Sequence, residues 1–365
     1  MSLTTYPTCI ETCWKADVDK KPLVYDRTLA QWQDQMEHLG QPAYRARQIW
    51  SGLYQDLVTD AQQITTLPQA LRDRLEQVYS FHTLQVATSL QSKDGKTHKV
   101  LLRLHDGKTI EAVLMRYDQR RTTCISTQVG CAMGCVFCAT GQMGFDRNLT
   151  SGEIIEQVLF FARQLSSQQD RLTNIVFMGM GEPFHNYAAT LAAIRMLNDP
   201  QGFAFGARRM TLSTVGIVPM IDRFAGENLQ VNLAISLHAA NDRERDALLP
   251  INRRYPLSEL LSACHRYVEA THRRVTFEWA LIENQNDSPQ QAQELAALLK
   301  GLLCHVNLIP LNPTAGYQAT PSSHERVKAF SQILIDAGIP STIRARRGIE
   351  IQAGCGQLAS QQPRL

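Results

Sequence analysis

The chain has 365 residues, of which 44% are hydrophobic and 19% charged, and its formal net charge is +3. No stretch approaches the roughly 18 consecutive apolar residues of a membrane-spanning helix, and the first residues lack the basic start and apolar centre of a secretory signal. We therefore expect a cytoplasmic protein with no membrane segment. Because cytosolic thiols are kept reduced, the nine cysteines predict metal binding or catalysis rather than a disulfide framework.

The N-terminal part has the pattern of a small helical domain followed by antiparallel strands. Apolar residues such as Leu29 and Trp32 recur three and four positions apart, which is the period of an amphipathic helix. Alternating polar and apolar residues then predict strands at 82–88, 99–104 and 109–115, with Asp-Gly turns between them. The expected divisions are an N-terminal extension at 1–26, a helical accessory domain at 27–80, a β-hairpin linker at 81–120, a βα domain at 121–352 and a C-terminal loop at 353–365.

Beyond residue 121, strand-like and helix-like segments alternate. Strands are predicted at 123–128, 174–178, 209–214, 230–237, 275–282, 304–310 and 342–346, and helices at 152–165, 187–198, 218–224, 257–269, 290–299 and 325–337. Capping boxes are expected at Thr150 and Ser322, each followed three residues later by a glutamate. About six βα units indicate parallel strands with outer helices, fewer than a complete eight-fold barrel. The predicted fold class is α/β, a partial (β/α)6 TIM-like barrel with its chemistry at the carboxyl ends of the strands.

Three closely spaced cysteines form the sharpest motif. Cys131, Cys135 and Cys138 follow the first predicted barrel strand, so we expect them in a loop at the carboxyl edge of the sheet. Thiolates at such spacing ligate iron–sulfur clusters or zinc, and three ligands leave a fourth coordination position open. One alternative is a structural zinc site with Cys124 as the fourth ligand. The motif therefore predicts a metal centre, with an open position available to a cofactor in the iron–sulfur case.

The C-x3-C-x2-C pattern at the start of a βα series resembles that of the radical S-adenosylmethionine (SAM) enzymes. Residues 179–183, Gly-Met-Gly-Glu-Pro, are similar to the segment with which that superfamily holds the methionyl amine of SAM. Longer strings look like the RlmN/Cfr group of adenosine methyltransferases, at residues 124–131, 138–149, 236–238, 307–313 and 353–358. Pro183, Phe145 and Arg147 favour the RlmN type within this group.

The resemblance implies two cofactors and the residues that hold them. Cys131, Cys135 and Cys138 would bind a 4Fe-4S cluster whose open iron chelates SAM. The family's SAM contacts correspond in this chain to Gly181, Glu182, Ser213, Ser236, Leu237, His238 and Asn312. Two SAM molecules would be consumed per turnover, one as methyl donor and one as the source of a 5′-deoxyadenosyl radical.

The resemblance also implies roles for two distant cysteines and one glutamate. Cys355 would accept a methyl group and deliver it to carbon 2 of an adenine through a covalent enzyme–RNA adduct. Attack by Cys124 would release methyladenosine and form a Cys124–Cys355 disulfide, and Glu111 matches the family's proton acceptor. The implied substrates are an adenosine in 23S rRNA and the adenosine next to the anticodon in tRNA. We also expect an electron donor such as flavodoxin, and a monomer.

Other interpretations stay open at this point. The reaction could be the Cfr-like methylation of carbon 8 on the same rRNA adenosine, or the chain could be a non-catalytic zinc-containing RNA-binding protein. Glu111 could face water or pair with Lys99, and Cys355 could be a buried structural thiol. The remaining cysteines are expected to be core residues, Cys264 and Cys304, or incidental ones, Cys9 and Cys13.

Overall fold

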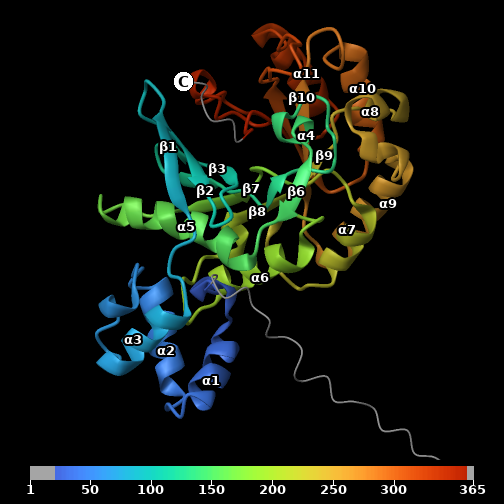
Figure 1. The fold of residues 1–365 in the computed structure, drawn as a ribbon. Helices are drawn as coiled ribbons and strands as arrows, with labels where there is room; N and C mark the ends of the chain where they lie inside the picture. The colour runs from blue at the N-terminus through green and yellow to red at the C-terminus, as the bar shows by residue number, and fades with distance from the viewer. Residues whose placement is uncertain (1–20, 360–365) are drawn as a thin grey trace, which may run out of the picture.

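The structure is a computed structural model that describes residues 21–359. Most of the expected N-terminal extension, with Cys9 and Cys13, lies outside the described residues, as do residues 360–365 of the C-terminal loop. Figure 1 shows the N-terminal helices grouped below the sheet and the later helices wrapped around its outer side. Across residues 21–359, no helix has both the length and the apolar character needed to cross a bilayer.

The N-terminal group consists of three helices and two 3-10 turns: α1 (Leu29–His38), α2 (Tyr44–Tyr54), α3 (Gln69–Val78), η1 (Val24–Asp26) and η2 (Ala61–Gln63). Thr28 caps α1 by accepting a hydrogen bond from the Gln31 N–H group. Trp32 and Trp50 are buried, so the group encloses apolar side chains of its own. Asp26 accepts a hydrogen bond from the Gly152 N–H at 2.7 Å, which ties this group to the first outer helix of the βα domain.

Antiparallel strands follow the helical group: β1 (Gln85–Gln91), β2 (Thr97–Arg103) and β3 (Thr109–Arg116). β3 also pairs antiparallel with β4 (Arg121–Cys124), and Val113 lies opposite Cys124. The three hairpin strands are therefore part of the same sheet as the barrel strands, and this continuity fixes their position relative to the barrel.

Seven parallel strands form the barrel part of this sheet: β4, β7 (Asn174–Phe177), β8 (Met210–Thr214), β9 (Asn232–Ser236), β10 (Val275–Leu281), β11 (Cys304–Pro310) and β12 (Ser341–Ile343). The predicted outer helices are α5 (Ser151–Ser166), α6 (Tyr187–Asn198), α7 (Val218–Ala225), α9 (Leu257–Thr271), α10 (Pro289–Leu298) and α11 (His324–Asp336). Shorter helical segments, which the sequence pattern did not predict, are α4 (Ala139–Gln142), α8 (Asp242–Leu248), η3 (Ala207–Arg209), η4 (Pro250–Arg253) and η5 (Ile349–Ile351). The 10-stranded order runs from β1 to β12 without closing, which confirms the predicted partial barrel.

The first predicted barrel strand, at 123–128, was too long. β4 ends at Cys124, and Gln128–Gly130 forms β5, which pairs antiparallel with β6 (Phe145–Asn148) in a separate two-stranded sheet. The chain leaves the barrel in between, because the Thr127 N–H donates to the Met180 carbonyl at 2.8 Å instead of continuing the β4 ladder. The three cysteines of the motif therefore lie beside the barrel, in the connection between β5 and β6 that this small ladder closes.

Of the two predicted capping boxes, the one at Thr150 is confirmed and the one at Ser322 is wrong by one residue. Thr150 forms the predicted capping box with Glu153. The N-cap of α11 is Ser323 rather than Ser322. The Ser322 hydroxyl instead donates to the Asp287 carboxylate at 2.7 Å, so a tertiary contact overrides the local signal.

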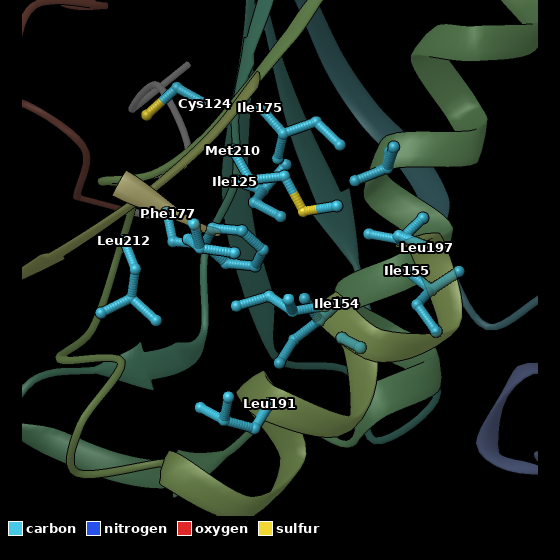
Figure 2. Packing of buried hydrophobic residues seen from close by; sticks show 14 of the residues in the cluster. Cys124, Ile125, Ile154, Ile155, Ile175, Phe177, Leu191, Leu197, Met210 and Leu212 are labelled. Atoms are coloured by element: carbon cyan, nitrogen blue, oxygen red, sulfur yellow. The ribbon is translucent and has the colours of Figure 1, made fainter. Parts of the chain in front are cut away.

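Buried apolar side chains fill the space between the barrel strands and their helices. Figure 2 shows this layer with labelled side chains from the β4 region, β7, β8, α5 and α6: Cys124, Ile125, Ile154, Ile155, Ile175, Phe177, Leu191, Leu197, Met210 and Leu212. In this view the Cys124 sulfur points away from the isoleucines. Cys124 therefore lies at the edge of this layer with its sulfur turned outward, whereas Ile125 is fully buried in it.

Candidate active site

A cavity opens where the parallel strands end. Its walls come from the loops after β7, β8 and β9, from residues of β10 and β11, and from two segments far apart in sequence, the cysteine motif and the C-terminal part. The lining includes these predicted residues: Cys131, Cys135, Cys138, Gly181, Glu182, Ser213, Ser236, His238, Asn312 and Cys355. The structure therefore brings most of the candidate residues together at the edge where barrel enzymes place their chemistry.

Residues 131–138, the cysteine loop, are closed at their base by the β5–β6 ladder. The Cys131 N–H donates to the Gly144 carbonyl at 2.8 Å. Gly130 has a φ of +72°, and a Cβ atom there would lie 2.0 Å from the Gly144 carbonyl oxygen, so this close approach requires glycine. These local contacts hold the loop with all three thiols on the cavity.

Burial raises the pKa of every thiol in the cysteine loop. The pKa of Cys131 rises to about 12, and those of Cys135 and Cys138 also lie above the ordinary value; for Cys135, repulsion from its two neighbours adds to burial. Among the described residues, His, Cys, Asp and Glu side chains form no group of three that is already arranged around an ion. The donor set, three thiols lining one cavity, nevertheless fits the attachment of an iron–sulfur cluster through three thiolates.

The glycine-rich segment after β7 lies directly against the β4–β5 connection. The Gly179 N–H donates to the Ile125 carbonyl at 3.0 Å. A Cβ atom at Gly179 would lie 2.6 Å from that carbonyl oxygen, and one at Gly181, where φ is +101°, would lie 2.6 Å from the Gln128 side chain. Both glycines are therefore required by close packing, and they bring Glu182 to the cavity.

Glu182 is buried at the cavity and held by backbone N–H groups. Its Oε1 accepts from Phe184 at 2.9 Å and its Oε2 from Val215 at 2.8 Å. Burial outweighs these hydrogen bonds and raises the pKa of Glu182 to about 7. Gln128, which no motif singled out, fixes this turn by accepting from the Glu182 N–H at 2.8 Å. A carboxylate held in this way is suited to bind a cationic ammonium group.

His238 and Leu237 differ in how they relate to the cavity. His238 has a φ of +60° and lines the cavity; its Nδ1 accepts from the Ala280 N–H at 2.8 Å, which leaves the proton on Nε2. Burial, and then the charge of Arg245, lower the pKa of His238 to about 3, so the ring is neutral. Leu237 is fully buried and is not part of the lining; its N–H donates to the Glu278 carbonyl at 3.1 Å.

Arg245 is a fully buried guanidinium that the sequence analysis missed. It donates to the carbonyls of Val215 at 2.8 Å and Ser236 at 3.1 Å, and to Asn252 Oδ1 at 2.8 Å. It therefore ties together the chain segments that follow β8 and end β9, both of which line the cavity. Nothing in the sequence distinguishes it from Arg243, an exposed residue on the same short helix.

A second pocket adjoins the cavity and is lined by both distant cysteines. Cys124 and Cys355 line it together with Tyr117 and Arg344, and Cys355 and Arg344 also line the main cavity. All cysteines within residues 21–359 are free thiols, so the Cys124–Cys355 disulfide expected from the resemblance is not present in this state. Burial raises the pKa of Cys124 to about 12, and the nearby Arg344 charge partly opposes this.

Residues 352–359, the Cys355 segment, are anchored through their backbone while the Cys355 side chain is exposed. Asn312 Nδ2 donates to the Cys355 carbonyl at 3.1 Å. Two residues that follow Cys138 also donate to the segment, the Ala139 N–H to Gly356 at 2.7 Å and the Thr140 hydroxyl to Leu358 at 2.6 Å. The alternative of a buried structural thiol at Cys355 is therefore wrong, whereas Cys264 and Cys304 are buried in the core as expected.

Glu111 lies on β3, outside the lining of both pockets. It is buried and pairs with Lys99 on β2, with 3.0 Å between Nζ and Oε1. Its Oε2 accepts from the Ala359 N–H at 3.1 Å. Pairing with Lys99, one of the interpretations left open by the sequence, is confirmed, and exposure to water is excluded. The role of proton acceptor stays a prediction.

Comparison with known proteins identifies the family. Residues 125–296 match the family model of the Radical SAM superfamily, and residues 24–80 match that of the Ribosomal RNA large subunit methyltransferase N-terminal domain. A protein of Chloroflexus aurantiacus named Probable dual-specificity RNA methyltransferase RlmN is 49% identical over 349 residues, which cover 93% of each chain. Dual-specificity RNA methyltransferase RlmN 1 of Myxococcus xanthus is 51% identical over 315 residues, 86% of this chain and 88% of that protein.

A solved structure agrees with these matches. The crystal structure of a radical SAM methyltransferase from Sphaerobacter thermophilus is 52% identical, superposes with a TM-score of 0.91, and covers 93% of this chain and 100% of its own. The resemblance seen in the sequence is confirmed, and membership of the superfamily implies a 4Fe-4S cluster and SAM as cofactors. This chain belongs to the RlmN family of radical SAM RNA methyltransferases.

Proposed function

We propose that this enzyme methylates carbon 2 of an adenosine in 23S rRNA and of the adenosine next to the anticodon in tRNA. The relatives described above carry the name dual-specificity RNA methyltransferase. The observation that carries the proposal is that Cys355 lines both the cavity of the cysteine loop and the pocket of Cys124. A thiol between two spaces can receive a methyl group on one side and present it to a nucleobase on the other.

The cavity side would hold the cofactors. We assign the cluster to Cys131, Cys135 and Cys138, and SAM to the lining residues Gly181, Glu182, Ser213, Ser236, His238 and Asn312, together with Leu237 behind them. When bound, the cluster and two SAM molecules per turnover supply the methyl group and the one-electron chemistry that activates it. Glu182 would bind the SAM ammonium group, and the neutral His238 would donate a hydrogen bond through Nε2. A flavodoxin-type protein would supply the electron, and the enzyme would act as a monomer.

Cys355 and Cys124 would act in sequence on the other side. Cys355 would carry the methyl carbon as a thioether, and that carbon, after losing one hydrogen atom, would bond to carbon 2 of the adenine and link RNA to protein. Carbon 2 would then release its ring proton to a base and one electron to the one-electron chemistry that the cluster supplies. The Cys124 sulfur would then attack the Cys355 sulfur; the bond from sulfur to carbon breaks, its electron pair stays with the carbon, which takes a proton, and a disulfide forms. Because burial raises the pKa of Cys124 to about 12, its own proton must leave to a base before the attack. Glu111, which matches the family's proton acceptor, is proposed to accept a proton in this sequence, although it lies outside the lining of both pockets. The positive charge of Arg344 favours the thiolate.

Basic and aromatic side chains around the second pocket support an RNA substrate. Arg346, Arg347 and Tyr117 line it. The guanidinium groups of Arg120 and Arg347 lie 4.8 and 4.5 Å from the centre of the Tyr117 ring. Guanidinium groups bind RNA phosphates and stack on unpaired bases. The pocket beneath them is suited to an adenine that has been unstacked from folded RNA.

One alternative is kept as an outcome of the test and one is not retained. Methylation of carbon 8 of the same rRNA adenosine would use the same groups. A non-catalytic zinc-containing RNA-binding protein is excluded by membership of a methyltransferase family. Its fourth zinc ligand is also misplaced, because Cys124 lines the second pocket and not the cavity of the cysteine loop.

Anaerobic turnover with a 23S rRNA fragment and with tRNA, followed by mass spectrometry of the nucleosides, tests the proposal. We expect 2-methyladenosine from both RNAs. A product methylated at carbon 8 would overturn the assigned position, and a product from one RNA alone would overturn the dual substrate. In Cys124→Ala the RNA should stay covalently bound to the protein, whereas in the matched variant Cys264→Ala, a buried core thiol, product should be released.

A further inference from the structure

The buried ion pair between Lys99 and Glu111 has a second set of partners in the Cys355 segment. Lys99 Nζ lies 3.0 Å from Glu111 Oε1, and the two side chains are 8% and 6% exposed. Lys99 Nζ also donates to the Gln352 carbonyl at 3.2 Å, and Glu111 Oε2 accepts from the Ala359 N–H at 3.1 Å. One pair of charges on the hairpin therefore contacts the first and the last residue of the segment.

Burying an ion pair between β2 and β3 carries a large desolvation cost. Withdrawing two charges from water costs more than packing apolar side chains of similar size, unless the remaining hydrogen-bonding capacity is satisfied. Here each charge gains one further partner, and both partners are backbone groups of the Cys355 segment. Apolar residues would pack β2 against β3 equally well. What the two charges add is a pair of hydrogen bonds to the backbone of the Cys355 segment.

The other anchors of the segment come from the cofactor side. Asn312 and the two residues after Cys138 bond to the carbonyls of Cys355, Gly356 and Leu358. Gly356 has a φ of +82°, and a Cβ atom at Gly354 would lie 2.6 Å from Asn312 Nδ2, so the chain around Cys355 is shaped by close contact. The Lys99–Glu111 pair of the hairpin anchors the segment from the other side, and the Cys355 side chain is exposed between these two sets of contacts.

We propose that Lys99, paired with Glu111, is a positioning residue that clasps both ends of the Cys355 segment and keeps Cys355 between the cavity and the second pocket. The inference rests on the proposed function in assigning Cys355 as the methyl carrier. Lys99 touches no reacting atom in this proposal. Its effect is to keep the carrier in reach of the activated cofactor, so that each cofactor cleavage leads to a methylated adenosine.

Hydrogen exchange of the protein without cofactors gives the first test, and it does not depend on the reaction. In Lys99→Met, amide exchange in the peptide covering residues 352–359 should quicken by about tenfold. The segment loses the hydrogen bond from Lys99 to Gln352, and Glu111, which accepts from Ala359, loses the charge that holds it in place. Lys99→Arg should restore most of the protection. The matched control is Lys108→Met, in the turn between β2 and β3, which removes an exposed ion pair with Asp146 on β6 and should leave this peptide unchanged.

Product coupling gives the second test, in the reconstituted enzyme with both RNA substrates. In Lys99→Met the ratio of 5′-deoxyadenosine formed to adenosine methylated should rise by about tenfold at unchanged iron content, and Lys99→Arg should return it towards the wild-type value. A purely structural role would lower both products equally. Unchanged exchange in residues 352–359 of Lys99→Met would overturn the proposal whatever the coupling shows, because Lys99 also pairs with Glu111, the proposed proton acceptor.

Two further comparisons keep the result interpretable. If Lys99→Met does not fold because it leaves Glu111 charged and unpaired, the double variant Lys99→Met/Glu111→Gln removes both charges, and its exchange at residues 352–359 must still exceed the wild type. If the wild-type enzyme yields no methylated adenosine from either RNA, the proposed function fails, while the exchange result still decides whether the clasp exists.

Discussion

The cysteine loop and the Cys355 segment line the same cavity but are held in opposite ways. The loop is closed by contacts between near neighbours, such as Cys131 with Gly144. The segment depends on Asn312, 43 residues away, and on Lys99, 253 residues away from the carbonyl that it holds. The loop also has one distant contact, from the Val136 N–H to the Leu248 carbonyl at 3.1 Å, but its three thiols are brought together by sequence spacing, whereas Cys355 reaches the cavity only through the tertiary fold.

The largest effect is expected from a substitution in the cysteine loop. In Cys135→Ala two thiols remain in the loop, so we expect loss of the cluster, of its brown colour and of all SAM cleavage. Iron analysis and absorption of the anaerobically reconstituted protein measure this. Cys304→Ala, a core thiol, is the control. Full iron content in Cys135→Ala would contradict the assignment of the loop.

The next largest effect is expected from Cys355→Ala, in the Cys355 segment. We expect normal iron content and continued cleavage of SAM, but neither a methylated protein nor a covalent RNA adduct nor a methylated adenosine, because the carrier sulfur is missing. Intact-protein and nucleoside mass spectrometry read out these products. RNA methylation at the wild-type rate would show that Cys355 is not the carrier.

Arg245 tests how far the cavity wall that faces both regions depends on one buried side chain. Arg245→Met leaves the Val215 and Ser236 carbonyls without their buried donor, so we expect the free energy of unfolding to fall by about 3 kcal/mol. Arg266→Met, which removes an exposed pair with Asp222, should change it by less than about 1 kcal/mol. Denaturant unfolding measures both, and equal effects would contradict the role assigned to the buried guanidinium.

The smallest expected effect is a pH dependence at His238. Its pKa is about 3 in the folded protein against 6.5 in the free side chain, so below pH 6.5 the unfolded chain takes up a proton that the folded chain refuses. Stability from this residue is complete above pH 6.5 and is lost as pH falls towards 3, by about 2–3 kcal/mol near pH 4.5. Asparagine tolerates the positive φ at this position. Between pH 7 and 4.5, the free energy of unfolding of His238→Asn, measured by urea titration, should therefore fall by about 2–3 kcal/mol less than that of the wild type. Identical losses would show that burial does not suppress the charge.

The strands and helices of the barrel followed from sequence because their period is local. Tyr187–Asn198, for example, was predicted with its observed bounds, and the cysteine loop followed from spacing alone. The Cys355 segment was found only through resemblance, because Gly-Cys-Gly has no period and its anchors are distant in sequence.

Other features lay beyond the sequence pattern for physical reasons. Residues 125–128, of which only Gln128 belongs to β5, looked like a continuation of β4, and only the hydrogen bond from Thr127 to Met180 shows where the chain turns away. Arg245 has the same local signal as an exposed helical arginine. Lys99 and Glu111 are opposite charges on neighbouring strands, and pairing was foreseen, but the contacts with residues 352–359 depend on the tertiary structure.

The sequence separation of these last contacts has a consequence for the order of folding. The contacts of Ala359 with Glu111 and of Gln352 with Lys99 close loops of 248 and 253 residues. Because closing a long loop costs conformational entropy, we expect these contacts to form late in folding, after the neighbouring strands have paired. The barrel and hairpin can therefore reach their native arrangement first, and the docking of residues 352–359 completes the enzyme. The same ordering makes this segment the first to detach under mild denaturant, so activity should be lost before the barrel melts.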